Sequence, residues 1–131
     1  MTLAPLPDNH RTKTKIFTMN LAQAAETYDL AACNAVGGVL VESVQIFGNV
    51  VGATFDSVSI QTTNTVPEEI LSAAEGAVAN IVAGKNIKSF TTKFYLAVSK
   101  KIQFTIAGAT GTGSCLVVVT YRPTVNGADI S

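Results

Sequence analysis

The stretch "KIQFTIAGATGTGSCLVVVTY", residues 101–121, decides the fold class of this chain. Its first part alternates Ile102, Phe104 and Ile106 with polar residues, which is the period of a half-buried strand. The part from residue 115 onward is rich in β-branched and aromatic residues, which also favour a strand. A strand, a glycine-rich loop and a second strand together predict a β-hairpin.

The glycine-rich loop, "GATGTGSC" at residues 108–115, has part of the pattern of a phosphate-binding loop. Gly108 and Gly113 have the required spacing, but Ser114 stands where a lysine would reach the phosphates. A strand follows in place of the helix whose N-terminus would face the anion. We therefore interpret the loop as a turn.

Most of the remaining chain has the same strand-like alternation, separated by short turns. The sequence predicts an all-β fold, an antiparallel β-sandwich, and not a series of βαβ units. The further predicted strands lie within residues 13–20, 26–31, 38–48, 53–64 and 90–99.

The segment 38–48 contains one residue that does not fit the alternation. Leu40, Val44 and Ile46 are predicted to face inward, with Val41 on the opposite face. Glu42 falls on the inward face, and a bulge or an edge position would relieve it.

The segment 67–83 resists the strand pattern. Ile70, Ala74 and Ile81 recur at helical spacing, after a proline and two glutamates and before a glycine, which are helix start and stop signals. Gly76 and the many alanines fit equally well with two close-packed strands. The pattern favours one short helix covering an end of the sandwich.

Composition indicates a single domain that another chain covers in part. Only 14% of the 131 residues are charged and 47% are hydrophobic, against about 25% charged in average soluble domains. Since so few charges leave an apolar exterior, we expect part of the surface to bind another protein. A compact monomer rich in serine and threonine is the alternative.

We expect three parts along the chain. Residues 1–13 form an extended, proline-containing N-terminal arm, residues 14–125 form the sandwich, and residues 126–131 form a polar C-terminal tail on the surface. Prolines stand where a signal peptide would be apolar, and no run reaches the ~20 residues of a membrane span, so we expect synthesis in a cytoplasm and no membrane partner. The candidate partner-binding residues are Leu3, Pro5, Leu6, Pro7, Arg11, Lys13 and Lys15.

The charges divide the chain into two halves of opposite sign. All charged residues from Glu26 to Glu75 are acidic, and all those from Lys85 to Arg122 are basic. Either the two sets mix on the surface of interleaved strands, or an acidic face meets a basic face on a neighbouring molecule.

The residues that carry chemistry are few, and we expect no enzyme, no cofactor and no metal site. The one histidine, His10, lies in the arm, and Cys33 and Cys115 are predicted to be buried structural thiols, with a bridge between them left open. Glu68 and Glu69 are sequence neighbours and so point to different sides, which argues against a glycosidase pair.

Direct nucleic-acid binding is not expected either. The formal net charge is zero, and an aromatic stacking platform would have to be exposed on a basic sheet. Phe94 and Phe104 alternate with aliphatic neighbours and belong in the core, which leaves Tyr95 as the exposed aromatic residue.

Three segments, "ETYDLAACNAVGGVLVESVQIFG" (26–48), "ATFDSVSIQTTNT" (53–65) and "LAVSKKIQFTIAGATGTGSCLVVVTYRP" (96–123), resemble the small all-β accessory proteins of tailed-phage virions. The nearest type is the capsid decoration, or cement, protein with a jelly-roll sandwich. The resemblance implies a virion protein, made in the host cytoplasm, that binds the major capsid protein on the capsid exterior. It also implies a homotrimer that bridges neighbouring capsomers, with residues 1–15 as the clamp, and it supplies no catalytic residues.

A receptor- or glycan-binding head of a phage fibre, or a small tail component, is the alternative. Sugar sites place an exposed aromatic ring beside amide and carboxylate groups. The chain has no tryptophan, so such a site would need Tyr28, Tyr95 or Tyr121.

Overall fold

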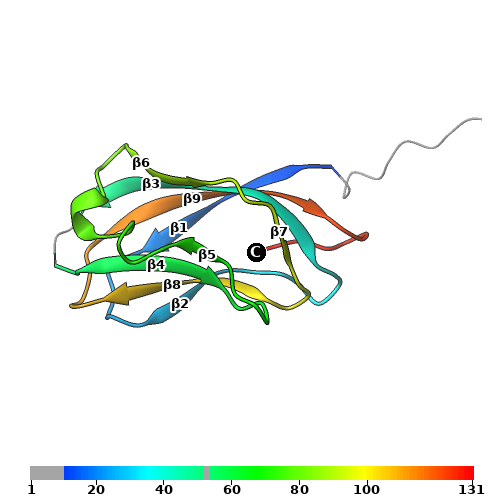
Figure 1. Cartoon of the computed structure of the whole chain (residues 1–131), viewed down its shortest axis with the longest axis horizontal. Helices are drawn as coiled ribbons and strands as arrows, with labels where there is room; N and C mark the ends of the chain where they lie inside the picture. The colour runs from blue at the N-terminus through cyan, green and yellow to red at the C-terminus, as the bar shows by residue number, and fades with distance from the viewer. Residues whose placement is uncertain (1–10, 52–53) are drawn as a thin grey trace, which may run out of the picture.

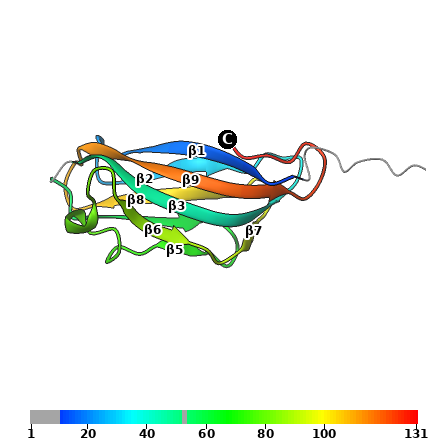
Figure 2. The same cartoon turned by 90° about the horizontal axis from the view of Figure 1, so that it is seen from above.

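The computed structural model describes residues 11–51 and 54–131, and of Val51 only the backbone. Two antiparallel β-sheets pack face to face as a sandwich (Figures 1 and 2). Sheet A holds β1 (Lys13–Asn20), β9 (Gly113–Pro123), β3 (Val39–Val51), β6 (Asn86–Phe90) and β7 (Phe94–Leu96). Sheet B holds β2 (Thr27–Ala32), β8 (Lys101–Ala107), β4 (Ser57–Thr62) and β5 (Glu69–Leu71).

The strand order identifies the sandwich as a jelly roll. Sheet A runs β1-β9-β3-β6, with β7 beside β6 along the same edge of β3, and sheet B runs β2-β8-β4-β5. Apart from the steps β4–β5 and β6–β7, which stay within one sheet, successive strands alternate between the sheets, as in a double Greek key. The predicted all-β, jelly-roll-like sandwich is confirmed. No helix among the described residues is long and apolar enough to cross a membrane.

The two strands of residues 101–121 are confirmed, but their pairing as a hairpin is wrong. β8 pairs with β2 and β4, whereas β9 pairs with β1 and β3, so the glycine loop crosses from one sheet to the other. The loop packs closely: Leu21 donates its N–H to Gly113 O at 3.0 Å, and a Cβ on Gly111 would lie 2.1 Å from Leu21 O. Alternation predicts each strand, but not which sheet receives it.

The core lies between the sheets and is built from the inward-facing residues of both. Tyr121, Met19, Ile46, Ile102 and Ile106 are among its largest buried side chains. Phe94 and Phe104 are buried in this core and Tyr95 is exposed, as predicted. Cys33 and Cys115 are buried free thiols without a bridge between them.

A bulge at Glu42 changes which residues of β3 face the core. The register to β9 shifts between Val41 and Ser43, so Val41 joins Val44 on the buried side. Leu40 is half-buried and lies on the outer side, so its predicted inward direction is wrong. The predicted bulge is confirmed, and it removes the carboxylate from the interior.

The amphipathic helix favoured for residues 67–83 does not form as such. β5 occupies Glu69–Leu71, and the only helical part of this segment is one 3-10 turn, Val78–Asn80. Gly76 explains the outcome, because its carbonyl accepts a hydrogen bond from Val58 N–H at 2.9 Å. The segment therefore lies against β4 through its backbone, and its small residues permit that approach.

The C-terminal segment is not a surface tail, because it closes one side of the sandwich. Ala128 and Ile130 are buried, and the backbone of Asp129–Ser131 pairs with that of Ala32–Asn34 beside β2. The carboxylate of Asp129 accepts hydrogen bonds from Tyr121 Oη of β9 and from Lys15 Nζ of β1, the latter at 3.3 Å. The segment thus joins sheet B to two strands of sheet A.

The carboxylate of Asp129 and its hydrogen bonds to Tyr121 and Lys15, called the clasp below, predict a contribution to stability that is lost in acid. Burial raises the pKa of this carboxyl, but hydrogen bonds from Tyr121, from Ile130 N–H and from Lys15 outweigh it, so the pKa lies below its ordinary value. The stabilisation is therefore present above the ordinary pKa near 4 and disappears as the pH falls through the lower folded value.

Asp129→Asn is expected to lower the free energy of unfolding by about 1 kcal/mol at pH 7, since the side chain is 39% exposed and partly screened. The difference from the parent should vanish near pH 2 in urea unfolding. Asp29→Asn, which breaks an exposed pair with Lys101, serves as the control and should cost less. An equal loss in both variants at pH 7 contradicts the clasp.

Candidate partner-binding surface

Exposed apolar side chains gather at one end of the sandwich. This end, where β1 begins and the loops β2–β3, β4–β5 and β7–β8 lie, is called the arm end. Among the residues whose side chains the structure describes, eight large hydrophobic ones are exposed, and this end carries five of them: Val36, Val66, Tyr95, Val98 and Val125. Of the other three, Val50 and Val82 lie toward the opposite end and Ile16 lies in the middle of β1.

The loops of the arm end are held together by close packing at glycines. The ring of Tyr95 lies on Gly38, where an added Cβ would be 2.2 Å from it. Likewise, a Cβ on Gly37 would be 2.3 Å from a methyl group of Val125. The side chain of Asn64 fixes the neighbouring loop, donating to Tyr95 O at 2.8 Å. The loops that carry the exposed apolar residues are therefore held in a fixed conformation.

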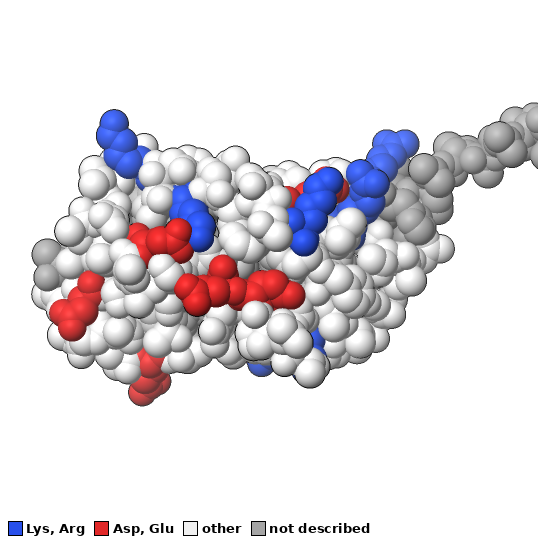
Figure 3. Space-filling view, viewed as in Figure 1, with Lys and Arg blue, Asp and Glu red and all other residues white. Residues whose placement is uncertain are grey.

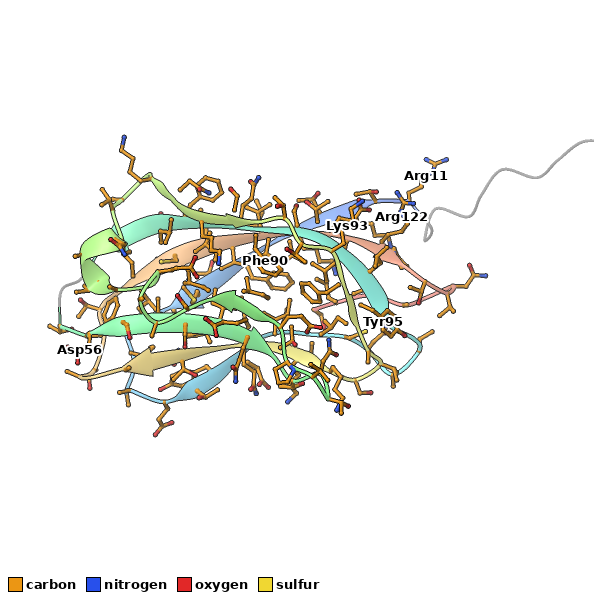
Figure 4. The ribbon with its side chains drawn as sticks, in the orientation of Figure 1. Arg11, Asp56, Phe90, Lys93, Tyr95 and Arg122 are labelled. Carbon is orange, nitrogen blue, oxygen red and sulfur yellow. The ribbon has the colours of Figure 1, made fainter. Side chains whose placement is uncertain are left out.

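Basic side chains border the arm end on the sheet A side. Arg11, Lys93 and Arg122 lie there (Figure 4), and the space-filling view shows blue atoms grouped at this end (Figure 3). Arg122 Nε lies 3.5 Å from Glu42, and Thr12 donates to the same carboxylate at 3.1 Å. Because Arg122 also donates to Thr12 at 3.2 Å, the chain just before β1 is fixed on the outer side of β3 and β9.

The residues predicted to bind a partner differ in their location and in whether they are bonded within the chain. Leu3, Pro5, Leu6 and Pro7 lie outside the described residues. Arg11 is exposed at the arm end, and Lys13 is half-buried in β1. Lys15 is used within the chain, because its ammonium donates to Ile130 O at 2.6 Å and pairs with Asp129.

The acidic and basic halves of the sequence mix in three dimensions. Glu75 pairs with Lys88 at 2.7 Å, Asp29 with Lys101 at 2.8 Å and Glu42 with Arg122 at 3.5 Å. Each pair joins one residue from each half. Of the two interpretations of the charge pattern, the structure favours mixing on interleaved strands.

A sugar site around the tyrosines receives little support from the geometry. Tyr121 is buried, and Tyr28 stacks on Phe104 with its hydroxyl bound to Ala24 O. Only Tyr95 is well exposed among the three, at 50%. The adjacent amide of Asn64 donates to Glu68 and Tyr95 O and accepts from Ala97 N–H, so its groups are already engaged.

The described residues bring together no catalytic or metal-binding set. No pocket is found among them, and no group of three or more His, Cys, Asp or Glu side chains could hold a metal ion. Burial raises the pKa of Cys115 to about 11, which keeps this thiol protonated near neutral pH. Cys33 donates its S–H to Gly37 O at 2.9 Å.

Sequence reasoning identified the exposed tyrosine of the arm end but missed its valines. Val36, Val66, Val98 and Val125 each stand in a different connecting segment, far apart along the chain. A single valine in a loop has no periodic signal. Only the jelly-roll topology brings the four segments to one end.

No protein-family model matches this sequence, and no curated protein matches it. Among solved structures, the chain is similar to the VP2 subviral particle of infectious bursal disease virus, with 10% identity over 90% of this chain and a TM-score of 0.39. It is also similar to a structure of the Gx strain of that virus, with 11% identity over 90% of this chain and a TM-score of 0.36. The chain spans about two fifths of the length of these matched chains, 39% in each case.

Proposed function

We propose that this chain is a structural protein of a tailed-phage virion, which decorates the outer surface of the capsid and bridges neighbouring capsomers. Its partner is the major capsid protein, and the arm end is the surface that binds it. The observation that carries the proposal is the gathering of Val36, Val66, Tyr95, Val98 and Val125 where the N-terminal arm begins. An exposed apolar patch with a polar rim is typical of a protein-binding site.

The composition of the surface supports a role of this kind. Apolar side chains at the centre supply area to be buried, and the bordering Lys93 and Arg122 give orientation toward a partner with acidic groups. The arm extends the contact, since ten residues before Arg11 can reach about 33 Å when extended. A chain attached at two places holds its partners more firmly than either contact alone.

A decoration protein that binds only the assembled lattice stabilises it by mass action. Packaged DNA presses capsomers apart, and each bound copy opposes their separation with the free energy of its own binding. The function therefore depends on the binding free energy of the contact surface and requires no reactive group.

Removal of residues 1–10 is expected to weaken capsid binding by at least about tenfold, because it removes one of the two contacts. The measurement is co-sedimentation of the purified chain with expanded capsids of the same virus, over a range of concentrations. Every strand that the structure describes begins after the removed residues, so thermal unfolding should show an intact fold. Equally tight binding of the shortened chain would contradict the role of the arm.

A further inference from the structure

The outer face of sheet A is uncharged across its central rows. Residues that alternate with the buried positions of β1, β9 and β3 form this face, and nothing in the described chain covers it. Its nine central residues, all uncharged, are Thr14, Ile16, Thr18, Leu116, Val118, Thr120, Ser43, Gln45 and Phe47.

Apolar side chains occupy the middle of this face. In the register, Val118 lies between Ile16 and Gln45, and Leu116 lies between Thr18 and Phe47. Ile16 is 65% exposed. Leu116, Val118 and Phe47 are half-buried, yet they are not among the residues that pack on the core. β9, apolar on both sides as the sequence shows, is thus central in its sheet with one apolar side uncovered.

The outer face of sheet B provides an internal comparison. Its residues are polar and bind one another: Thr27 and Thr105 are 2.8 Å apart between their hydroxyls, and Asp29 accepts from Lys101 and Gln103, each at 2.8 Å. Such a face is suited to water. The sandwich therefore has one polar outer face, on sheet B, and one apolar outer face, on sheet A. We expect the apolar face to be buried against another protein surface.

We infer that the outer face of sheet A binds the same face of a second copy of this chain, around a two-fold axis near Val118 and Leu116. Packing of like faces is an isologous contact and gives a closed dimer. Sheets that pack in this way lie about 10 Å apart, with their side chains interdigitated. The inference is independent of capsid binding.

The arrangement of charge is compatible with this symmetry. The charged groups beside the face at its arm end are Glu42, Arg122, Arg11 and Lys93. The other end carries Asn49 and Ser114, joined by a 3.1 Å hydrogen bond, and the exposed Lys85 lies beside Gly48 there. A two-fold axis that lies between the two faces and crosses the strands places the arm end of one copy, with Glu42, over the end of the other copy that carries Lys85. The uncharged central rows of the two copies then meet each other, and the charged groups stay at the two ends of the contact.

The area is sufficient for a specific dimer. Sheet A presents four rows spaced about 4.8 Å apart: β1, β9, β3, and β6 with β7 end to end along the edge of β3. With about eight residues of about 3.4 Å in each row, the face covers about 500 Å². Two such faces bury about 1,000 Å² in total, which reaches the lower range of specific protein contacts. We therefore expect a dimer of modest affinity, whose population rises with protein concentration.

Sedimentation velocity of the full chain, from about 1 to 100 μM, tests the inference. The parent should become a dimer as its concentration rises. Val118→Lys should weaken the dimer by more than about 100-fold, because it buries two unpaired cations near the axis. An equimolar mixture of Val118→Lys and Val118→Glu should dimerise again, since opposite charges then meet.

Thr105→Lys is the matched control, on the central strand and the outer face of sheet B. It should dimerise as the parent does, and thermal unfolding should show that both lysine variants are folded. A parent that stays monomeric overturns the inference, as does a dimer that Val118→Lys leaves intact. A trimer would also overturn it and would favour the three-fold assembly that the family resemblance implies.

Discussion

Replacing Tyr95 and Val98 together with aspartate is expected to lower the affinity for capsids by about 100-fold or more. Both side chains stand at the arm end, with exposed fractions of 50% and 44%. A partner that covers them gains the free energy of apolar burial, and a carboxylate in the same place must lose its water when the partner covers it. Co-sedimentation with expanded capsids measures the loss.

The chain offers a matched control at its opposite end. Val50 and Val82 are exposed to a similar extent, 59% and 47%. Val50→Asp with Val82→Asp adds the same number of charges, so it should leave the affinity for capsids within about twofold of the parent value. An equal loss in both double variants would mean that net charge, and not the arm end, decides binding.

Gly76→Ala is expected to lower the free energy of unfolding by about 3 kcal/mol, equivalent to a decrease in Tm of roughly 10 °C. A Cβ at this position would lie 1.7 Å from Val58 O and 2.9 Å from Val58 C. Both atoms belong to the backbone of β4, which cannot turn aside as a side chain could. The added methyl group must therefore separate the loop from the sheet and stretch the hydrogen bond between Val58 N–H and Gly76 O.

Gly84→Ala distinguishes this clash from a general glycine effect. No atom lies within 4 Å of a Cβ at Gly84, but its φ of +74° is unfavourable for alanine. The cost there should be about 1 kcal/mol, from the backbone alone. Urea unfolding of both variants at neutral pH gives the comparison. A cost at Gly76 no greater than that at Gly84 would contradict the close approach to β4.

Local patterns in the sequence account for the strands and the layered fold. Alternation predicts β1 at Lys13–Asn20, β8 at Lys101–Ala107 and the core position of Phe104, because each follows from neighbours on the same strand. The bulge was also predictable, since Glu42 could not stay on a buried face.

Features that depend on distant segments were not predictable in the same way. The glycine loop before β9 crosses between the sheets because β9 pairs with β1 and β3. The sequence of the loop itself does not indicate which strands β9 will pair with. Helical spacing in residues 67–83 was outweighed by the contact of Gly76 with β4. Ile130 is buried because β2 pairs with the chain end, although the tail is polar in composition.

The same limit applies to the candidate site. The sequence indicates that this chain needs a cover, because 14% charged residues cannot surround a domain of this size. It does not indicate where, since Val36, Val66 and Val125 come to the same end of the sandwich as Tyr95 only in the folded chain. The surface is therefore a product of topology, and the predicted arm residue Arg11 lies at its border.

Cryo-electron microscopy of capsids saturated with the full chain, at a resolution that separates the two sheets, tests the proposed function most directly. The account predicts copies of the sandwich on the outer surface at boundaries between capsomers, with Tyr95 and Val98 of the arm end against the major capsid protein. Capsids without the sandwich, or a sandwich attached by the opposite end around Val50 and Val82, would contradict it.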